Sequence, residues 1–360
     1  MSLEVIRNLG WDLISGSAKA ALLGILVLAV RAGLRRHLSP AWRLILWGVV
    51  LVRLIWPWEI PTPVSLFNVM VPWLPSITAS SFPLDGWRWA AVVWGVGLLL
   101  GFARLLVECR RIRAKIHRAA LVDPGLVALW NEVIEGGPAF LSGVRLRSSP
   151  EVFTPCVAGL FRPCLLVPSD LGERFSGEEI RLMFLHEMAH LRRRDLWVDM
   201  ALESIRILHW FNPVVGWVLR RWREDREEMC DVHALSSDRV SNLAYGRVLL
   251  KCLESGATST TGIPVETTQT MIAAGWMGAA SAAPRSLVHR MEAIVRFRTG
   301  RRTWIVGACT LLAVGLLGLT EQRPLPPRRV WMLETHLARS PLAPSALSGI
   351  LPARRTAPQI

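Results

Sequence analysis

The stretch His186-Glu187-Met188-Ala189-His190 has the pattern H-E-x-x-H and is the most informative feature of this chain. In a helix, residues four apart project from the same face, so the imidazoles of His186 and His190 can bind one Zn²⁺ ion. Glu187 then lies beside the open coordination position, where a carboxylate can act as a general base. The pattern therefore predicts a zinc site of the kind that metalloproteases use.

The residues around this pattern predict a helix. Ser176-Gly177-Glu178-Glu179 reads as a capping box, in which the Ser176 side chain accepts from the amide of Glu179 and Glu179 reaches back. Arginines at 192–194 follow in the last turn, where positive charge suits a helix C-terminus. An amphipathic core helix with two incidental histidines is the alternative interpretation.

A catalytic zinc site needs a third protein ligand and leaves a fourth position for water. The charge run at residues 223–228 supplies Glu227 and Glu228. They fall near the far end of a helix that we expect to begin after Asn212 as N-cap, with Pro213 at its first position. Either glutamate could complete a His-His-Glu set, which favours zinc. A solvated, charged helix face is the alternative.

Several motifs, in the same order along the chain, resemble those of the BlaR/MecR-type integral-membrane metallopeptidases. This is an antirepressor family whose best-known members sense β-lactams. The matching segments are 38–43 (LSPAWR), 154–163 (TPCVAGLFRP), 185–195 (LHEMAHLRRRD), 210–213 (WFNP) and 227–231 (EEMCD). The resemblance extends over most of the chain, from about residue 12 to about residue 320.

The resemblance implies roles for the residues of the E-x-x-C-D motif. It gives Glu227 as the third zinc ligand and leaves Glu228 as the weaker candidate. Asp231 is expected to orient a ligating histidine, and Cys230 is expected to be a small buried side chain. The donor that stabilises the oxyanion is not identified, and the open candidates are His209, His233 and Tyr245.

The composition predicts an α-helical membrane protein. Hydrophobic residues make up 51% of the chain, which has 17 Trp and one Tyr. Apolar runs lie at about residues 11–30, 44–58, 87–107 and 303–319. Each run is close to the length of about 20 residues that a spanning helix needs, although the second is short. We therefore expect four transmembrane helices.

The flanking charges predict the orientation. Lys and Arg cluster after the first and third apolar runs and before the fourth, whereas residues 59–86 contain none. By the positive-inside rule, residues 59–86 form an outer loop, and the zinc motif lies on the cytoplasmic side of a bacterial plasma membrane. Arginines that meet anionic lipid headgroups also account for much of the net charge of +14. No zinc-finger or RNA-binding signature is present, so nucleic acid is not an expected partner.

These observations predict four parts. Residues 1–108 hold three transmembrane helices, 109–302 form a cytoplasmic metallopeptidase domain, 303–320 form the fourth helix, and 321–360 are a flexible extracytoplasmic tail. The domain is expected to be an α+β zincin-like (gluzincin) fold with strands at 144–147, 152–157 and 163–167. Leu165-Leu166-Val167 is the candidate edge strand for aligning an extended substrate, with an ordinary core strand as the alternative. The six scattered cysteines are expected to stay reduced.

Three functions fit the sequence. The favoured one is a regulatory protease that cleaves a cytoplasmic repressor, or itself, in response to an outer signal. The alternatives are a housekeeping membrane protease for damaged or prenylated proteins, whose usual second motif ends in Ala-Asp rather than Cys230-Asp231, and a non-catalytic membrane scaffold. The tail at 321–360 contains no Lys and so no Ser-x-x-Lys motif. The penicillin-binding sensor domain of the best-known members is therefore not expected, and a separate sensor protein could supply the signal.

Overall fold

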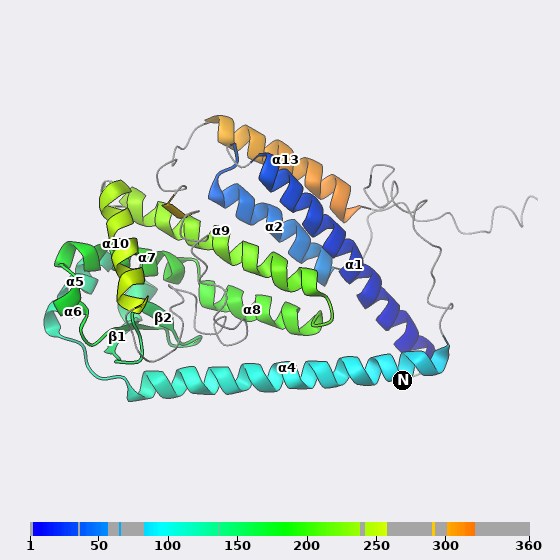
Figure 1. Ribbon diagram of the computed structural model, residues 1–360, viewed down its shortest axis with the longest axis horizontal. Coiled ribbons are helices and arrows are strands. Elements are labelled where there is room, and N and C mark those ends of the chain that lie inside the picture. Colours follow the sequence, from blue (N-terminus) through cyan, green and yellow to red (C-terminus); the bar gives the residue numbers. More distant parts are fainter. Residues whose placement is uncertain are drawn as a thin grey trace, which may run out of the picture.

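A computed structural model describes residues 3–34, 37–56, 65, 83–135, 137–237, 242–257, 290–291 and 301–320. Most of these residues are helical (Figure 1). The helices are α1 (Leu3–Gly33), α2 (Pro40–Ile55), α4 (Leu84–Arg118), α5 (Pro124–Ile134), η3 (Ala139–Gly143), α6 (Leu171–Arg174), α7 (Gly177–Arg192), α8 (Asp195–Leu208), α9 (Pro213–Ser237), α10 (Asn242–Ala257) and α13 (Arg301–Leu319). The predicted tail and nearly all of the predicted outer loop lie outside the described residues.

Among the described residues, two helices are long and apolar enough to cross a bilayer. They are the segments Glu4–Gly33 of α1 and Asp85–Arg118 of α4. The other two predicted spans form α2 and α13, which are shorter, at 16 and 19 residues. The structure thus supplies two candidate spans, and the four-span arrangement stays a prediction.

The apolar helices pack against one another and against the rest of the chain. α2 contacts α1, α9 and α13, and α1 also contacts α4. Their shared core includes Leu23 of α1, Trp47 of α2 and Val218 of α9, all of them fully buried or nearly so. Figure 1 shows α8 and α9 lying between α4 and α2, so part of the predicted soluble block lies directly against the apolar helices.

A small three-stranded sheet stands beside these helices. Its strands are β1 (Arg145–Ser148), β2 (Cys156–Ala158) and β3 (Cys164–Val167), in the order β1-β3-β2. β3 pairs parallel with β1 and antiparallel with β2. The expectation that Leu165–Val167 forms an edge was therefore wrong. All four residues of β3 are buried, as a continuous apolar run requires when a strand has neighbours on both sides.

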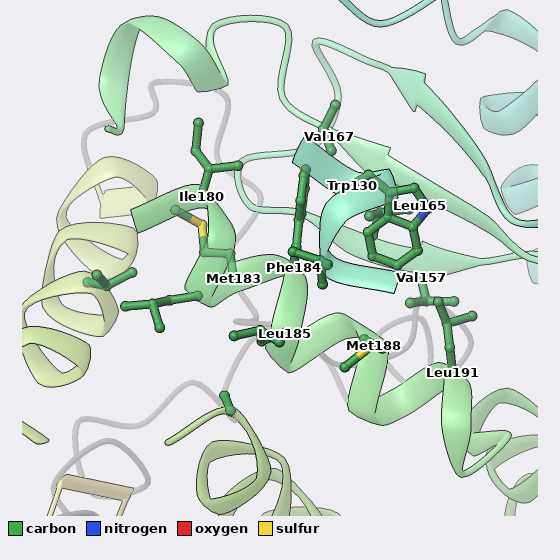
Figure 2. Close-up of a cluster of buried hydrophobic side chains, with 14 of the residues drawn as sticks. Trp130, Val157, Leu165, Val167, Ile180, Met183, Phe184, Leu185, Met188 and Leu191 are labelled. Carbon is green, nitrogen blue, oxygen red and sulfur yellow. The ribbon is translucent and has the colours of Figure 1, made fainter. Parts of the chain in front are cut away.

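The helix that carries H-E-x-x-H packs onto this sheet. Ser176 and Glu179 form the predicted capping box by reciprocal hydrogen bonds, and α7 is buried from residue 182 to residue 191. Figure 2 shows side chains of α7 meeting those of β2, β3 and α5, with Phe184 edge-on to Trp130 at a ring separation of 5.6 Å. Burial on several sides holds the two histidines in a fixed position.

Candidate metal centre

Three side chains from two helices converge at the centre of the site. His186 and His190 come from α7 and Glu227 from α9, and all three are at most 6% exposed. His186 Nε2 lies 3.5 Å from Glu227 Oε2, and His190 Nε2 lies 3.7 Å from Glu227 Oε1. Two ligands that each lie about 2.0–2.1 Å from a tetrahedral zinc are separated by roughly 3.3 Å, so the spacing suits one ion.

The converging atoms lack hydrogen-bond partners in the part of the chain that the structure describes. Among the described residues, none pairs with Nε2 of His186, Nε2 of His190 or either carboxylate oxygen of Glu227. Buried polar atoms are nearly always paired, and leaving four of them unpaired in one place is costly. A metal ion is the partner that suits two imidazole nitrogens and a carboxylate.

Cys230 is a second possible ligand on α9. One ligand atom from each of His186, His190 and Cys230 can be chosen so that all three lie within 4.8 Å of one another. The sulfur, however, lies 3.5 Å from Nδ1 of His190 and 2.9 Å from Nη2 of Arg193. It therefore lies on the side of the imidazole away from Nε2, and the geometry favours Glu227.

Glu228 faces a different helix from its neighbour Glu227. Its carboxylate pairs with the guanidinium of Arg43 on α2, which also contacts Asp225 at 3.1 Å. Successive residues of a helix point about 100° apart, so Glu227 and Glu228 cannot both face the histidines. Contact with α2 thus separates two glutamates that were equivalent in the local sequence.

Each histidine is held at its other ring nitrogen by a buried carboxylate. Asp231 Oδ1 lies 3.1 Å from His186 Nδ1, and Asp195 Oδ2 lies 2.7 Å from His190 Nδ1. A proton on Nδ1 that points to a carboxylate leaves the Nε2 lone pair free for a metal. Arg194 adopts a left-handed conformation (φ 55°), which turns the chain so that Asp195, only five residues on, reaches back to His190.

Asp231 is itself held by two residues from distant parts of the chain. Tyr245 on α10 donates its hydroxyl proton to Asp231 at 2.8 Å, and Arg290 donates two hydrogen bonds at 2.6 and 2.7 Å. Tyr245 therefore lies on the Nδ1 side of His186. Of the other oxyanion candidates, His209 ends α8, and His233 lies in α9, with Arg192 and Arg193 close enough to affect its charge.

Glu187 is buried beside the histidines. Burial raises its pKa to about 7, against the opposing effect of His190, His186 and a backbone hydrogen bond from Val157 of β2. A carboxylate with a pKa near neutrality can both accept and release a proton at physiological pH. A cavity opens next to it, and its lining also includes Met183, Val248, Leu249 and Cys252.

The site has a negative potential that suits a cation. Burial lowers the pKa of His186, but the hydrogen bond to Asp231 and the nearby carboxylate of Glu227 outweigh that effect and raise it to about 9. Burial raises the pKa of Glu227, but the two histidines hold it below its ordinary value. The carboxylates thus stabilise positive charge at the imidazole edges where a metal would bind.

Comparison with known proteins identifies a family and several relatives. Residues 75–273, more than half of the chain, match the model of the BlaR1 peptidase M56 family. Regulatory protein BlaR1 of Bacillus licheniformis is 29% identical over 174 residues, 48% of this chain and 28% of that protein. The methicillin resistance mecR1 proteins of Staphylococcus aureus and Staphylococcus epidermidis are each 27% identical over 110 residues, 30% of this chain and 19% of each relative. The matched region thus spans less than a third of each relative's length. Because the family model matches more than half of this chain, the chain belongs to the BlaR1 peptidase M56 family.

Proposed function

We propose that this chain is a membrane-bound zinc endopeptidase with a regulatory role. The observation that carries the proposal is the convergence of the unpaired Nε2 atoms of His186 and His190 on the unpaired carboxylate of Glu227. These three side chains would hold the zinc. When bound, zinc supplies a Lewis acid that polarises the scissile carbonyl and acidifies a bound water.

The chain's own residues provide the proton transfers and the orientation. Glu187 accepts the proton of the attacking water and passes it to the leaving amine, as its pKa of about 7 allows. Asp195 and Asp231 keep the ligating histidines in the tautomer that binds metal. The backbone N–H of Val157 keeps the Glu187 carboxylate next to β2.

The edge of the sheet supports binding of an extended peptide. Within the described residues β2 pairs with β3 alone, which leaves its other edge without a strand partner, and its residues also contact α7. A substrate that aligned with β2 by backbone hydrogen bonds would pass Glu187 and the histidines. This assignment replaces the predicted edge at Leu165–Val167.

The relatives support a role in signalling. One is named a regulatory protein and the others methicillin resistance proteins. We propose a cytoplasmic repressor, or the chain itself, as substrate, and a separate sensor protein as a possible source of the outer signal. The positive-inside pattern supports our proposal that the site lies at the cytoplasmic face of the membrane, which the family resemblance implies is a bacterial plasma membrane.

Zinc content tests the ligand assignment. The protein is purified in detergent as wild type and as Glu227→Gln, Glu228→Gln and Cys230→Ser variants. We expect one zinc per chain in the wild type, Glu228→Gln and Cys230→Ser, and loss of zinc in Glu227→Gln. Zinc retained by Glu227→Gln and lost from Cys230→Ser would overturn the assignment in favour of a His-His-Cys site.

A further inference from the structure

The helices α8 and α9 form a hairpin that buries charged side chains and exposes apolar ones, the reverse of what is usual for a protein surface in water. Over residues 195–219, all of which the structure describes, the charged side chains are buried and the exposed side chains are apolar. The buried charges are Asp195, Asp199, Glu203 and Arg206. The exposed residues are Trp197, Ala201, Trp210, Phe211, Pro213 and Trp217. A surface of this kind is unfavourable in water and is expected against lipid.

The tip of the hairpin lies against the middle of the candidate span α4. Trp94 on α4 donates its indole N–H to the carbonyl of Leu208 at 3.1 Å. Trp210 packs so closely on Gly97 that a Cβ there would collide with its ring. Gly97 is at the centre of the apolar run 87–107, so the tip reaches about half way along that span.

Contacts with the other candidate span, α1, independently give the same depth for the tip of the hairpin. Asn212 at the tip donates to the carbonyl and hydroxyl oxygens of Ser17 on α1, at 3.1 and 2.7 Å. Further along α9, Val218 packs on Gly24. Ser17 lies in the first half of the apolar run 11–30, on the side predicted to face outward. Both contacts therefore place the tip at or beyond the midplane of the predicted membrane region.

The rest of α9 fits this depth. The distance from Asn212 to Glu227 is about 22 Å along a helix that rises about 1.5 Å per residue, whereas half of the hydrocarbon core is about 15 Å thick. With the tip at the midplane, the metal site would then lie a few ångströms beyond the hydrocarbon core, at the cytoplasmic surface of the membrane. Arg220 and Arg221, the first partly exposed charges of α9, fall about 12–14 Å from the tip, close enough to the boundary for their heads to reach water.

The charged side chains inside the hairpin form ion pairs with one another. Arg206 and Arg223 both pair with Glu203, and Arg226 pairs with Asp199 at 2.7 Å. Intramembrane charges face the protein interior and pair with one another. The series ends at Asp195, whose carboxylate holds His190 and lies 3.8 Å from Arg226.

We propose that α8–α9 is a re-entrant membrane hairpin whose tip ends inside the bilayer and whose base holds the metal site at the cytoplasmic surface. Lipid acyl chains cover Trp210, Phe211 and Trp217. The prediction that residues 109–302 are wholly cytoplasmic would then fail for this hairpin. The proposal rests on burial and packing and does not depend on peptidase activity.

Spin labels at single cysteines test the proposal in the full chain. Test sites are Trp217→Cys and the more conservative Ala201→Cys, in a background with the incompletely buried Cys109, Cys156 and Cys309 replaced by serine. Leu99→Cys on α4 is the bilayer control and Leu243→Cys on α10 the aqueous control, at exposures of 73% and 75%. The protein is reconstituted in phosphatidylethanolamine–phosphatidylglycerol vesicles, and collisions with oxygen and with a water-soluble nickel chelate are measured.

We expect the label at 217 to behave like the label at 99, with oxygen collisions retained and nickel collisions lost. The label at 201, nearer the base, should show the same preference for oxygen at a shallower depth. Nickel collisions at 217 and 201 equal to those at 243 would overturn the proposal, because the face would then be in water. Low collision rates with both reagents would also overturn it, because another protein segment would then cover the face.

Discussion

Replacing Arg43 by methionine tests whether α2 fixes the helix that carries Glu227. Arg43 is 7% exposed in its side chain and bridges two buried carboxylates of α9, those of Glu228 and Asp225. Asp225 keeps two other donors, Arg31 at 2.5 Å and the indole of Trp47 at 2.9 Å. Within the described residues, Glu228 has no other cation at ion-pair distance, so removing Arg43 mainly leaves the Glu228 carboxylate unpaired.

The magnitude follows from this burial. Removing one partner of a buried ion pair typically costs about 3–5 kcal/mol, because the other charge stays buried and unpaired. For a chain of 360 residues, that corresponds to a fall in the unfolding midpoint of roughly 4–7 °C. The double variant Arg43→Met/Glu228→Gln removes both charges, so we expect it to recover a large part of the loss.

Thermal unfolding in detergent, followed by tryptophan fluorescence, measures the effect. Arg88→Met is the matched control, because Arg88 pairs with Asp85 at the surface of α4 with exposures of 59% and 83%. An exposed pair contributes about 0–1 kcal/mol, so this variant should unfold close to wild type. The reasoning is refuted if Arg43→Met and Arg88→Met have the same unfolding midpoint. It is also refuted if adding Glu228→Gln to Arg43→Met restores none of the lost stability.

Three further predictions concern helix packing, pH and the groups behind the metal ligands. Gly97→Ala should destabilise the protein, because its Cβ meets the ring of Trp210. Gly95→Ala, with nothing within 4 Å of the added Cβ, should be neutral or stabilising by up to about 1 kcal/mol. Unfolding midpoints that rank the other way would contradict the packing of the α8–α9 turn on α4. Zinc affinity, measured by chelator competition, should weaken as pH falls from 9 towards 6, because His186, with a pKa of about 9, must lose a proton to bind metal; a flat profile would argue against histidine ligation. Asp195→Asn should weaken zinc binding about 10–100-fold through His190, while Asp170→Asn on the surface should not, and equal affinities would exclude the positioning role of Asp195.

Local patterns were enough to predict the elements that carry the site. The capping box starts α7 where expected, and the side chain of Asn212 accepts from the amide of Val214 at the start of α9. The apolar run before Pro168 forms β3 within one residue of its predicted start. These signals are local, because a cap or an apolar period depends on residues only a few positions apart.

The relations between distant segments could not be predicted in the same way. The order of the strands is set by pairing across the sheet, so the central position of β3 was not visible in its own residues. Arg290 reaches Asp231 from 59 residues away along the chain. Glu228 is directed away from the histidines by its ion pair with Arg43, which belongs to another helix. Each of these features depends on contacts between residues far apart in the sequence, and no local sequence pattern predicts such contacts.

The α8–α9 hairpin shows a further limit of prediction from local sequence patterns. Its charges made the segment resemble part of a soluble domain, because a hydropathy average counts Glu203 and Arg223 as polar wherever they point. Their pairing across the two helices removes those charges from the outer surface and leaves tryptophans exposed. Only the packed structure separates the polar interior from the apolar exterior.

The most direct test of the account is self-cleavage measured together with metal content in lipid vesicles, for the wild type and Glu187→Gln. Glu187 lies beside the metal site and is proposed as the general base, so its loss should reduce cleavage about 10²–10⁴-fold and leave the ligands intact. The account predicts one zinc per chain in both proteins and cleavage only in the wild type. Absence of zinc from both proteins, or undiminished cleavage by Glu187→Gln, would contradict it.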